Sequence, residues 1–198
     1  MQRPTLRLAH SDDAEQIASI YGPLVRDTAV TFEVDVPSAS EMRSRIIDTA
    51  MRLPWLVAER DDHIAGFAYA GRHRRRAAYA SSADVSIYVA DGTRRLGIGR
   101  GLYTALLDLL SAQGYANVFA GIALPNDASV ALHESFEFSL VGVYRSVGYK
   151  LGAWWDVAWW QRPLPPVGPT PPPPKAMVEI DRDHLERALA SGRAHLAD

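Results

Sequence analysis

The sequence contains no cysteine among its 198 residues. Zinc–thiolate sites, thiol nucleophiles, redox Cys-x-x-Cys pairs and disulfide frameworks are therefore excluded. A body of ~150 residues can bury roughly 70% of its unfolded surface, so it needs neither a crosslink nor a structural metal to be stable. A chain without cysteine also fits a reducing compartment, and we expect a cytoplasmic protein.

Long apolar runs and lysine are scarce as well. No apolar run approaches the ~18 residues of a membrane-spanning helix, and the first ten residues lack the apolar core of a signal peptide. We therefore expect neither membrane insertion nor export. Lysine occurs only at Lys150 and Lys175, so nearly all positive charge is arginine, and the net charge of −2 gives no overall attraction to nucleic acid.

Proline marks the main break in the chain. Eight of the 13 prolines lie in residues 163–175, a segment that is predicted to be a stiff spacer because proline cannot enter a helix or sheet interior. Residues 176–198 then carry apolar side chains near helical spacing. We predict a body over 1–162, a proline-rich linker over 163–175 and an amphipathic helical tail over 176–198. The tail is expected to dock on the body or on a partner subunit; recruitment of another protein through the prolines is the alternative.

The body alternates segments of strand and helix periodicity. Helices are expected at 11–21, 38–52, 97–113 and 128–136, strands at 6–9, 84–89 and 117–123, hairpins at 56–71 and 140–161, and extended chain at 31–34. This order predicts an α/β protein with a mixed sheet whose N-terminal half is antiparallel.

A glycine-rich segment between a predicted strand and a predicted helix carries the clearest chemical signal. In the run RRLGIG, Gly97 and Gly99 leave the amides of the first helical turn uncovered, and these amides together with the helix dipole suit a diphosphate. A dinucleotide motif would need glycine where Leu102 stands, and the lysine of a Walker loop is absent. A glycine-rich turn without any ligand is the remaining alternative.

The pattern of Arg94, Gly97 and Gly99 resembles the acetyl-CoA loop of the GCN5-related N-acetyltransferases (GNAT). The segments 28–37, 54–59, 66–71, 124–134 and 147–161 look like the phosphinothricin and methionine sulfoximine acetyltransferase branch of that family. The resemblance covers about residues 4–162. It implies a central mixed sheet of six to seven strands flanked by helices, with a V-shaped cleft for acetyl-CoA between two central strands.

The resemblance also implies which residues contact acetyl-CoA. Backbone groups of the strand before the loop, the loop itself and one asparagine on the following helix are expected to bind it: Ile87, Tyr88, Val89, Arg94, Arg95, Leu96, Gly97, Ile98, Gly99, Arg100 and Asn126. No metal is implied. Acetyl-CoA enters as a co-substrate.

Two residues are candidates for proton transfer. Acetyl transfer to an amine needs a base for the ammonium group and an acid for the departing thiolate. Asp84 is the carboxylate nearest the thioester strand, where the relatives carry Glu, and it is predicted to be the base, directly or through a water, or a ligand of the substrate ammonium. The resemblance implies that His133 is the acid, or shares the acid–base role with Asp84, because many acetyltransferases place Tyr there and this branch places His. The alternatives are that Asp84 is only an exposed residue at the end of a strand and that His133 has only a structural role.

The resemblance implies that the arginine-rich segment 72–76 recognises a small anionic amino-acid analogue, since an arginine fork pairs with carboxylate or phosphinate; a solvated basic loop is the alternative. Arg74 and Arg76 align best with basic positions of the relatives, and Tyr79 and Phe32, the latter from the same or the neighbouring subunit, are predicted as walls of the substrate site together with Asp84. The relatives carry Trp where this chain has His73. A contact with nucleic acid is a third, remote hypothesis, since no stacking surface accompanies the arginines.

Two further features concern packing. Glu137 stands where the family has a helix-ending Gly, and a Glu there would strain the turn by about 1 kcal/mol. The Trp pairs at 154–155 and 159–160 are expected to face the core on one side and a partner or the cleft on the other. We predict a homodimeric N-acetyltransferase with acetyl-CoA as donor. The alternative is an acyl-CoA-binding sensor that has lost turnover.

Overall fold

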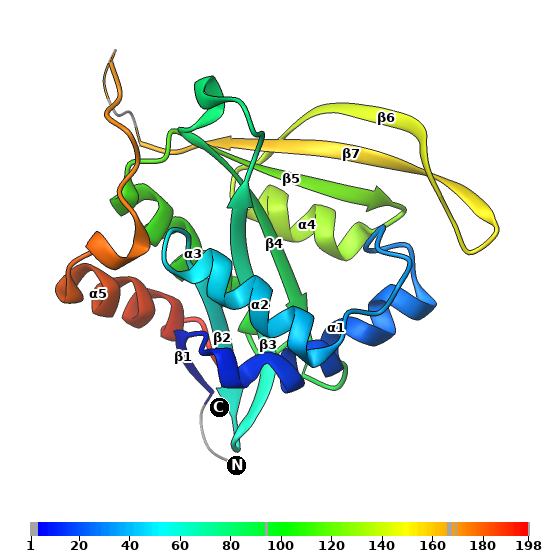
Figure 1. Cartoon of the computed structure of the whole chain (residues 1–198), viewed down its shortest axis with the longest axis horizontal. Helices are drawn as coiled ribbons and strands as arrows, with labels where there is room; N and C mark the ends of the chain where they lie inside the picture. Colours follow the sequence, from blue (N-terminus) through cyan, green and yellow to red (C-terminus); the bar gives the residue numbers. More distant parts are fainter. Residues whose placement is uncertain (1–3, 94, 166–167, 169, 198) are drawn as a thin grey trace.

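The computed structural model describes residues 4–93, 95–165, 168 and 170–197. Its centre is a seven-stranded sheet in the order β1-β2-β3-β4-β5-β7-β6 (Figure 1). The strands are β1 (Thr5–Leu8), β2 (Trp55–Arg60), β3 (His63–Arg72), β4 (Ser82–Val89), β5 (Asn117–Leu124), β6 (Ser139–Lys150) and β7 (Ala153–Pro163). Neighbouring strands are antiparallel except β4 and β5, which run parallel. The predicted mixed sheet is confirmed.

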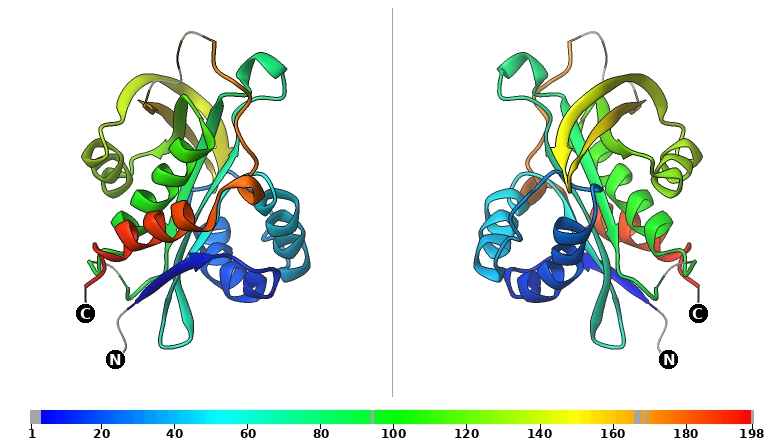
Figure 2. Two further views of the ribbon diagram at one scale, coloured as in Figure 1. Left: turned by 90° about the vertical axis from the view of Figure 1, so that its left-hand side faces the viewer. Right: turned by 90° about the vertical axis from the view of Figure 1, so that its right-hand side faces the viewer.

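Helices cover both faces of this sheet. Figure 2 shows α1 (Ala14–Asp27) and α2 (Ala39–Ala50) on one face, and α3 (Ile98–Gln113), α4 (Asp127–Ser135) and α5 (Arg182–Arg193) on the other. Ile17, Met42 and Phe67 belong to the apolar core of the first face, and Leu102 and Leu106 to that of the second. None of the described helices is both long and apolar enough to cross a membrane.

Local sequence signals explain most element ends. Ser38 caps α2 and forms a capping box with Glu41, whose carboxylate accepts from the Ser38 amide at 2.7 Å. Asp61 and Asp62 both adopt left-handed φ in the tight β2–β3 turn, as a two-residue hairpin requires. Gly114 ends α3 in the left-handed region.

The predicted end of the first helix was wrong. We expected it near Tyr21, but α1 continues to Asp27 with Pro23 inside it. The apolar stripe explains the difference: Ile17, Tyr21 and Val25 lie four residues apart and are all buried, so packing outweighs the cost of the proline. Residues 31–34 lie in the loop between α1 and α2.

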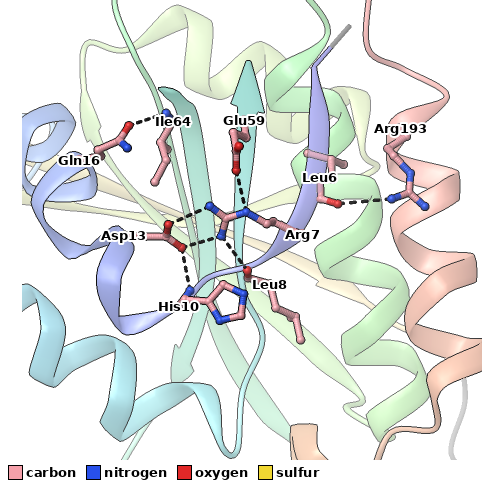
Figure 3. Close-up of polar contacts among 9 residues, drawn as sticks. All are labelled: Leu6, Arg7, Leu8, His10, Asp13, Gln16, Glu59, Ile64 and Arg193. Atoms are coloured by element: carbon pink, nitrogen blue, oxygen red, sulfur yellow. Dashed lines mark hydrogen bonds and ion pairs between the residues drawn. The ribbon is translucent and has the colours of Figure 1, made fainter. Parts of the chain in front are cut away.

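An arginine ties β1 to the sheet and to the start of the first helix (Figure 3). The Arg7 guanidinium donates to both carboxylate oxygens of Asp13 at 2.7 and 2.8 Å and to Glu59 on β2 at 2.7 Å. Burial alone would raise the pKa of Asp13, but the hydrogen bonds from Arg7 and from the His10 amide hold that pKa below its ordinary value. The ion pair therefore fixes the edge of the sheet.

The sheet divides at its centre. β4 and β5 pair only over Ser82–Asp84 and Asn117–Phe119, although β4 continues to Val89 and β5 to Leu124. Past Asp84 the two strands diverge, and backbone groups of β4 that point toward β5 have no strand partner there. We call the gap between the diverging ends of β4 and β5 the split, and the two cavities described below open at it.

The C-terminal segment returns to the body of the same chain. Beyond Pro163, which is the last residue of β7, the amide of Leu164 donates to Ala116 and that of Lys175 to Gln113. Helix α5 then packs along α3 and beside β1, and Leu189 and Leu196 are buried in the core of that face. Figure 2 shows α5 lying against α3.

Candidate active site

Two cavities open at the split between β4 and β5. The helix-side cavity, about 50 Å³, lies beneath α3 and α4 and is lined by Ile87, Tyr88, Tyr103, Asn126, Ser129 and His133, among others. The hairpin-side cavity, about 480 Å³, is lined by Phe32, Asp84, Tyr144, Val147 and Trp159, among others. Both cavities share Val85, Ser86 and Gly121, so the two spaces meet at the strands that diverge.

The glycine loop between β4 and α3 presents free amides beside the helix-side cavity. Gly97 caps α3 with φ +73°, and the first bond of the helix runs from the Gly101 amide to the Gly97 carbonyl at 2.8 Å. The amides of the first turn therefore lack helical acceptors, and together with the helix dipole they would favour an anion, as the sequence predicts. Arg95 is exposed and has φ +66°. The predicted Arg94 lies outside the described residues.

Some of the other predicted acetyl-CoA contacts lie at the helix-side cavity: Ile87, Tyr88 and Asn126 line it. A Cβ on Gly99 would lie 3.7 Å from Ile87 on β4 and 3.7 Å from Leu132 on α4, so Gly99 faces the split. Asn126 caps α4, accepting from the Ser129 amide at 3.2 Å, and it lines the helix-side cavity. The Arg100 guanidinium lies 5.9 Å from the Phe136 ring on the same side. These positions suit an extended donor that carries a diphosphate.

Asp84 forms a close pair with His73. The Nδ1–H of His73 donates to Oδ1 of Asp84 at 2.6 Å, and the imidazole stacks on Phe119 with ring centroids 4.2 Å apart. Burial raises the pKa of Asp84, while the hydrogen bond from His73 and the charges of His73 and Arg74 oppose that rise. A carboxylate with a raised pKa at the edge of a cavity is a stronger base than an exposed aspartate.

His133 is buried and has partners at both ring nitrogens. Its Nδ1–H donates to the Ser129 carbonyl at 2.7 Å, so in the neutral ring Nε2 accepts from the Tyr103 hydroxyl at 2.7 Å. Burial lowers the pKa of His133, which favours the neutral ring. In this state Nε2 carries no proton to give, and any proton from His133 must travel through Tyr103.

Of the predicted substrate residues, the structure brings some to the hairpin-side cavity and not others. Phe32 lines it, and its ring covers Gly148 so closely that a Cβ there would clash. The Arg74 guanidinium lies 5.3 Å from the Trp159 ring, which also lines it. Arg76 and Tyr79 are exposed in the loop between β3 and β4 and do not line the cavity, although Tyr79 makes an edge contact with His73.

Sequence reasoning missed one site residue, Tyr103, which lines the helix-side cavity, whereas a place at the cleft for one member of the 159–160 Trp pair was among the expectations. Trp159 lies opposite Gly121 on β5, and a Cβ built at 121 would lie 3.4 Å from its ring. Its Nε1–H is buried and lacks a hydrogen-bond partner among the described residues, while Trp160 faces the core.

Glu137 adopts the strained conformation that the sequence suggested. It follows the C-terminal cap of α4 with φ +62°, a region that favours glycine, and its carboxylate lies 3.8 Å from Arg162. Among the described residues, no three His, Asp or Glu side chains gather as they would around a metal ion.

Comparisons with known proteins agree with this geometry. Residues 6–159 match the family model described as an acetyltransferase (GNAT) domain. The chain is 39% identical to phosphinothricin N-acetyltransferase of Streptomyces coelicolor over 77% of this chain and 92% of that protein. It is 30% identical to the L-methionine sulfoximine/L-methionine sulfone acetyltransferase of Salmonella typhimurium over 81% of this chain and 94% of that protein. The crystal structure of a phosphinothricin acetyltransferase from Sinorhizobium meliloti in complex with AcCoA superposes with a TM-score of 0.81, at 34% identity over 87% of this chain and 94% of that one.

Proposed function

Because the chain belongs to the acetyltransferase (GNAT) family and uses acetyl-CoA as its donor, we propose that its acceptor is the free amino group of a small acidic amino-acid analogue. Phosphinothricin and methionine sulfoximine or sulfone are the leading candidates, since relatives carry those names. N-acetylation converts the ammonium to a neutral amide, so this activity would inactivate a toxic analogue. We place the reaction in the cytoplasm, where acetyl-CoA is available.

The observation that carries the proposal is the content of the hairpin-side cavity. It holds the Asp84 carboxylate, suited to an ammonium group, and the Trp159 ring, beside which the Arg74 guanidinium is suited to an anion. Arg74 lies over that ring and adds positive charge. A zwitterionic amino-acid analogue, which carries an ammonium group and at least one anionic group, satisfies both ends, whereas a simple diamine would satisfy only one.

The chemistry assigned to Asp84 is proton removal. Oδ1 of Asp84 accepts from His73, which leaves Oδ2 to take the proton from the substrate ammonium, directly or through a water. The neutral amine then attacks the thioester carbonyl, and backbone amides of β4 near Ile87–Val89 are placed to polarise it. His73 acts as a positioning residue, because its hydrogen bond and its stacking on Phe119 fix the carboxylate.

His133 remains our candidate for the acid. The route passes through Tyr103: an imidazolium Nε2–H donates to the phenol oxygen while the phenol proton passes to the departing sulfur. Since burial lowers the pKa of His133, the imidazolium is lost as pH rises through that lowered value. The acid role therefore predicts that kcat declines with rising pH in a range where an ordinary histidine would still be partly protonated.

A thiol-detection assay tests the acceptor. Release of CoA would be compared for phosphinothricin, methionine sulfoximine, methionine sulfone and glutamate, with putrescine as an acceptor that lacks any acid group. We expect the acidic analogues to give the highest kcat/KM. A preference for putrescine contradicts the proposed acceptor, and tight acetyl-CoA binding without CoA release from any amine would favour the sensor, which the comparisons do not support.

We also propose a homodimer formed through the β6–β7 hairpin. Its outer residues Tyr144, Tyr149 and Trp154 are 53%, 61% and 64% exposed, and such clustered aromatic side chains are typical of interfaces. Light scattering on the wild type and on Trp154→Glu tests this: we expect a dimer for the former and a monomer for the latter. A monomeric wild type at micromolar concentration contradicts the proposal.

A further inference from the structure

We propose that residues 192–197, here called the brace, hold the glycine loop between β4 and α3 in the conformation that binds the diphosphate of acetyl-CoA. The brace contacts the loop on the side away from the split. The proposal rests on the role of acetyl-CoA as donor and goes beyond it, because the brace lies outside residues 6–159, the part that matches the family. The brace comprises the last two residues of α5 and the four that follow, and it ends against the glycine loop. Donor affinity thereby depends on the C-terminal segment.

The brace and the glycine loop are in direct backbone contact. The Ala197 amide donates to the Leu96 carbonyl at 3.0 Å. The His195 carbonyl occupies the place where any side chain on Gly97 would stand, since a Cβ built there would overlap it. One turn along α3, a Cβ on Gly101 would lie 2.8 Å from the Gly192 carbonyl and 3.2 Å from Leu196 Cδ2. Two backbone segments therefore touch without side chains between them.

The loop has two faces, and the brace uses only one. Gly97 and Gly101 lie four residues apart and face the brace, whereas Gly99 faces Ile87 and Leu132 at the split. The amides available for a diphosphate are therefore bordered by the brace on one side and by the helix-side cavity on the other. The brace supports the loop and leaves its donor face open.

The loop needs such support because its backbone is conformationally unusual. Arg95 has φ +66°, a left-handed conformation that a non-glycine residue adopts at a cost, and Gly97 follows with φ +73°. The Ala197–Leu96 hydrogen bond lies between these two residues, and the buried Leu196 anchors it in the core. The brace thus stabilises the left-handed conformations at Arg95 and Gly97.

Anchoring of the tail explains how the brace keeps its place. The Arg193 guanidinium donates to the Leu6 carbonyl on β1 at 3.5 Å (Figure 3). A Cβ on Gly192 would meet the Gly101 carbonyl at 2.5 Å and Leu6 Cδ1 at 2.6 Å, so only glycine allows this approach. The brace is therefore wedged between β1 and the start of α3.

The test compares two leucines of the tail and two acetyl donors. Leu196→Ala loosens the brace, and Leu189→Ala removes a similarly buried leucine, 5% exposed against 3%, from α5 without touching the loop. Acetyl-CoA carries the diphosphate, whereas S-acetylpantetheine lacks it. For Leu196→Ala we expect KM for acetyl-CoA to rise about tenfold with kcat and the amine KM unchanged, and no change with S-acetylpantetheine. Leu189→Ala should lower Tm equally and leave both donors unaffected.

An equal rise in KM for acetyl-CoA in the two leucine variants would overturn the proposal. So would an equal rise in KM for acetyl-CoA and for S-acetylpantetheine in Leu196→Ala. If Leu196→Ala does not fold, Gly101→Ala serves instead, because its new methyl group displaces the Gly192 carbonyl while retaining every atom of the tail. Calorimetry with CoA alone gives the affinity without turnover, with the same tenfold weakening expected. A failure of the acceptor proposal therefore leaves this test intact.

Discussion

Replacing Asp84 with Asn separates proton removal from structure. The asparagine side chain has nearly the same shape, and its Oδ1 can still accept from His73 Nδ1, which lies 2.6 Å from the Asp84 oxygen. The His73 ring stays stacked on Phe119, so the geometry of the cavity is preserved. What the variant loses is the ability of this side chain to take the proton from the substrate ammonium.

The expected loss follows from that step. A positioned general base contributes about 10² to 10⁴ in rate, so kcat/KM for the amine should fall at least about 100-fold, or about 2.7 kcal/mol of transition-state stabilisation. KM for acetyl-CoA should stay constant, because the glycine loop is untouched. The gap between wild type and variant should narrow as pH approaches the amine's own pKa, because the amine then loses its proton without help.

The pH profile gives an independent reading of the same residue. The active form of Asp84 is the carboxylate, so activity should rise with pH through its pKa, which burial raises above the ordinary value. Asp84→Asn should abolish this acidic limb. His73→Phe removes the hydrogen bond that opposes the rise, so the limb should move to still higher pH in that variant.

Kinetics over a pH series with thiol detection provide the assay. Asp62→Asn in the β2–β3 turn is a matched control, because it makes the same chemical change far from the split at a position where Asn tolerates the left-handed backbone. Full activity and an unchanged acidic limb in Asp84→Asn would refute the assignment of the base.

Three further changes test other parts of the structure. His133→Gln should lower kcat and remove its decline with rising pH if the His133–Tyr103 route carries the proton; an unchanged profile with only a lower Tm assigns the pair to packing. Asp13→Asn should lower the free energy of unfolding by about 2 kcal/mol near neutral pH, since it leaves Arg7 partly unpaired. Because the pKa of Asp13 is lowered in the fold, this difference should be present above the ordinary carboxyl pKa and should vanish as pH falls through the lowered one; a pH-independent difference in urea titrations contradicts the reasoning. Glu137→Gly should raise the free energy of unfolding by about 0.5 to 1 kcal/mol by relieving the left-handed backbone, and a loss of stability would show that the contact with Arg162 matters more.

Local signals predicted most of the elements. The helix at 97–113 and its glycine ends, and the hairpin around Asp61–Asp62, were predictable because turn chemistry and periodicity act within a few residues. The end of α1 was not, because burial of Val25 by tertiary packing outweighs the proline signal at Pro23.

The candidate site was predictable where it lies along one strand–loop–helix unit. Asp84, Gly99 and Asn126 lie at or near the ends of neighbouring elements and all three lie at the split, while their roles stay predictions. For the Trp pairs the sequence left the cleft and a partner both open, because the place of Trp159 at the site depends on the insertion of β7 between β5 and β6, a pairing that local patterns do not specify. For the tail it left the body and a partner subunit both open, because the contact of the brace with Gly97 and Gly101 is tertiary.

The short pairing of β4 with β5 has a mechanical consequence. Three residue pairs join the four-stranded half of the sheet to the three-stranded half, so Ser82–Asp84 and Asn117–Phe119 form a narrow seam rather than a continuous hydrogen-bonded ladder. A molecule lying in the split bridges both halves and stiffens them together. Binding of acetyl-CoA in the split should therefore slow amide hydrogen exchange in β4 and in β5 together. Such a result would show that the two halves of the sheet are rigidly joined only when the ligand is bound.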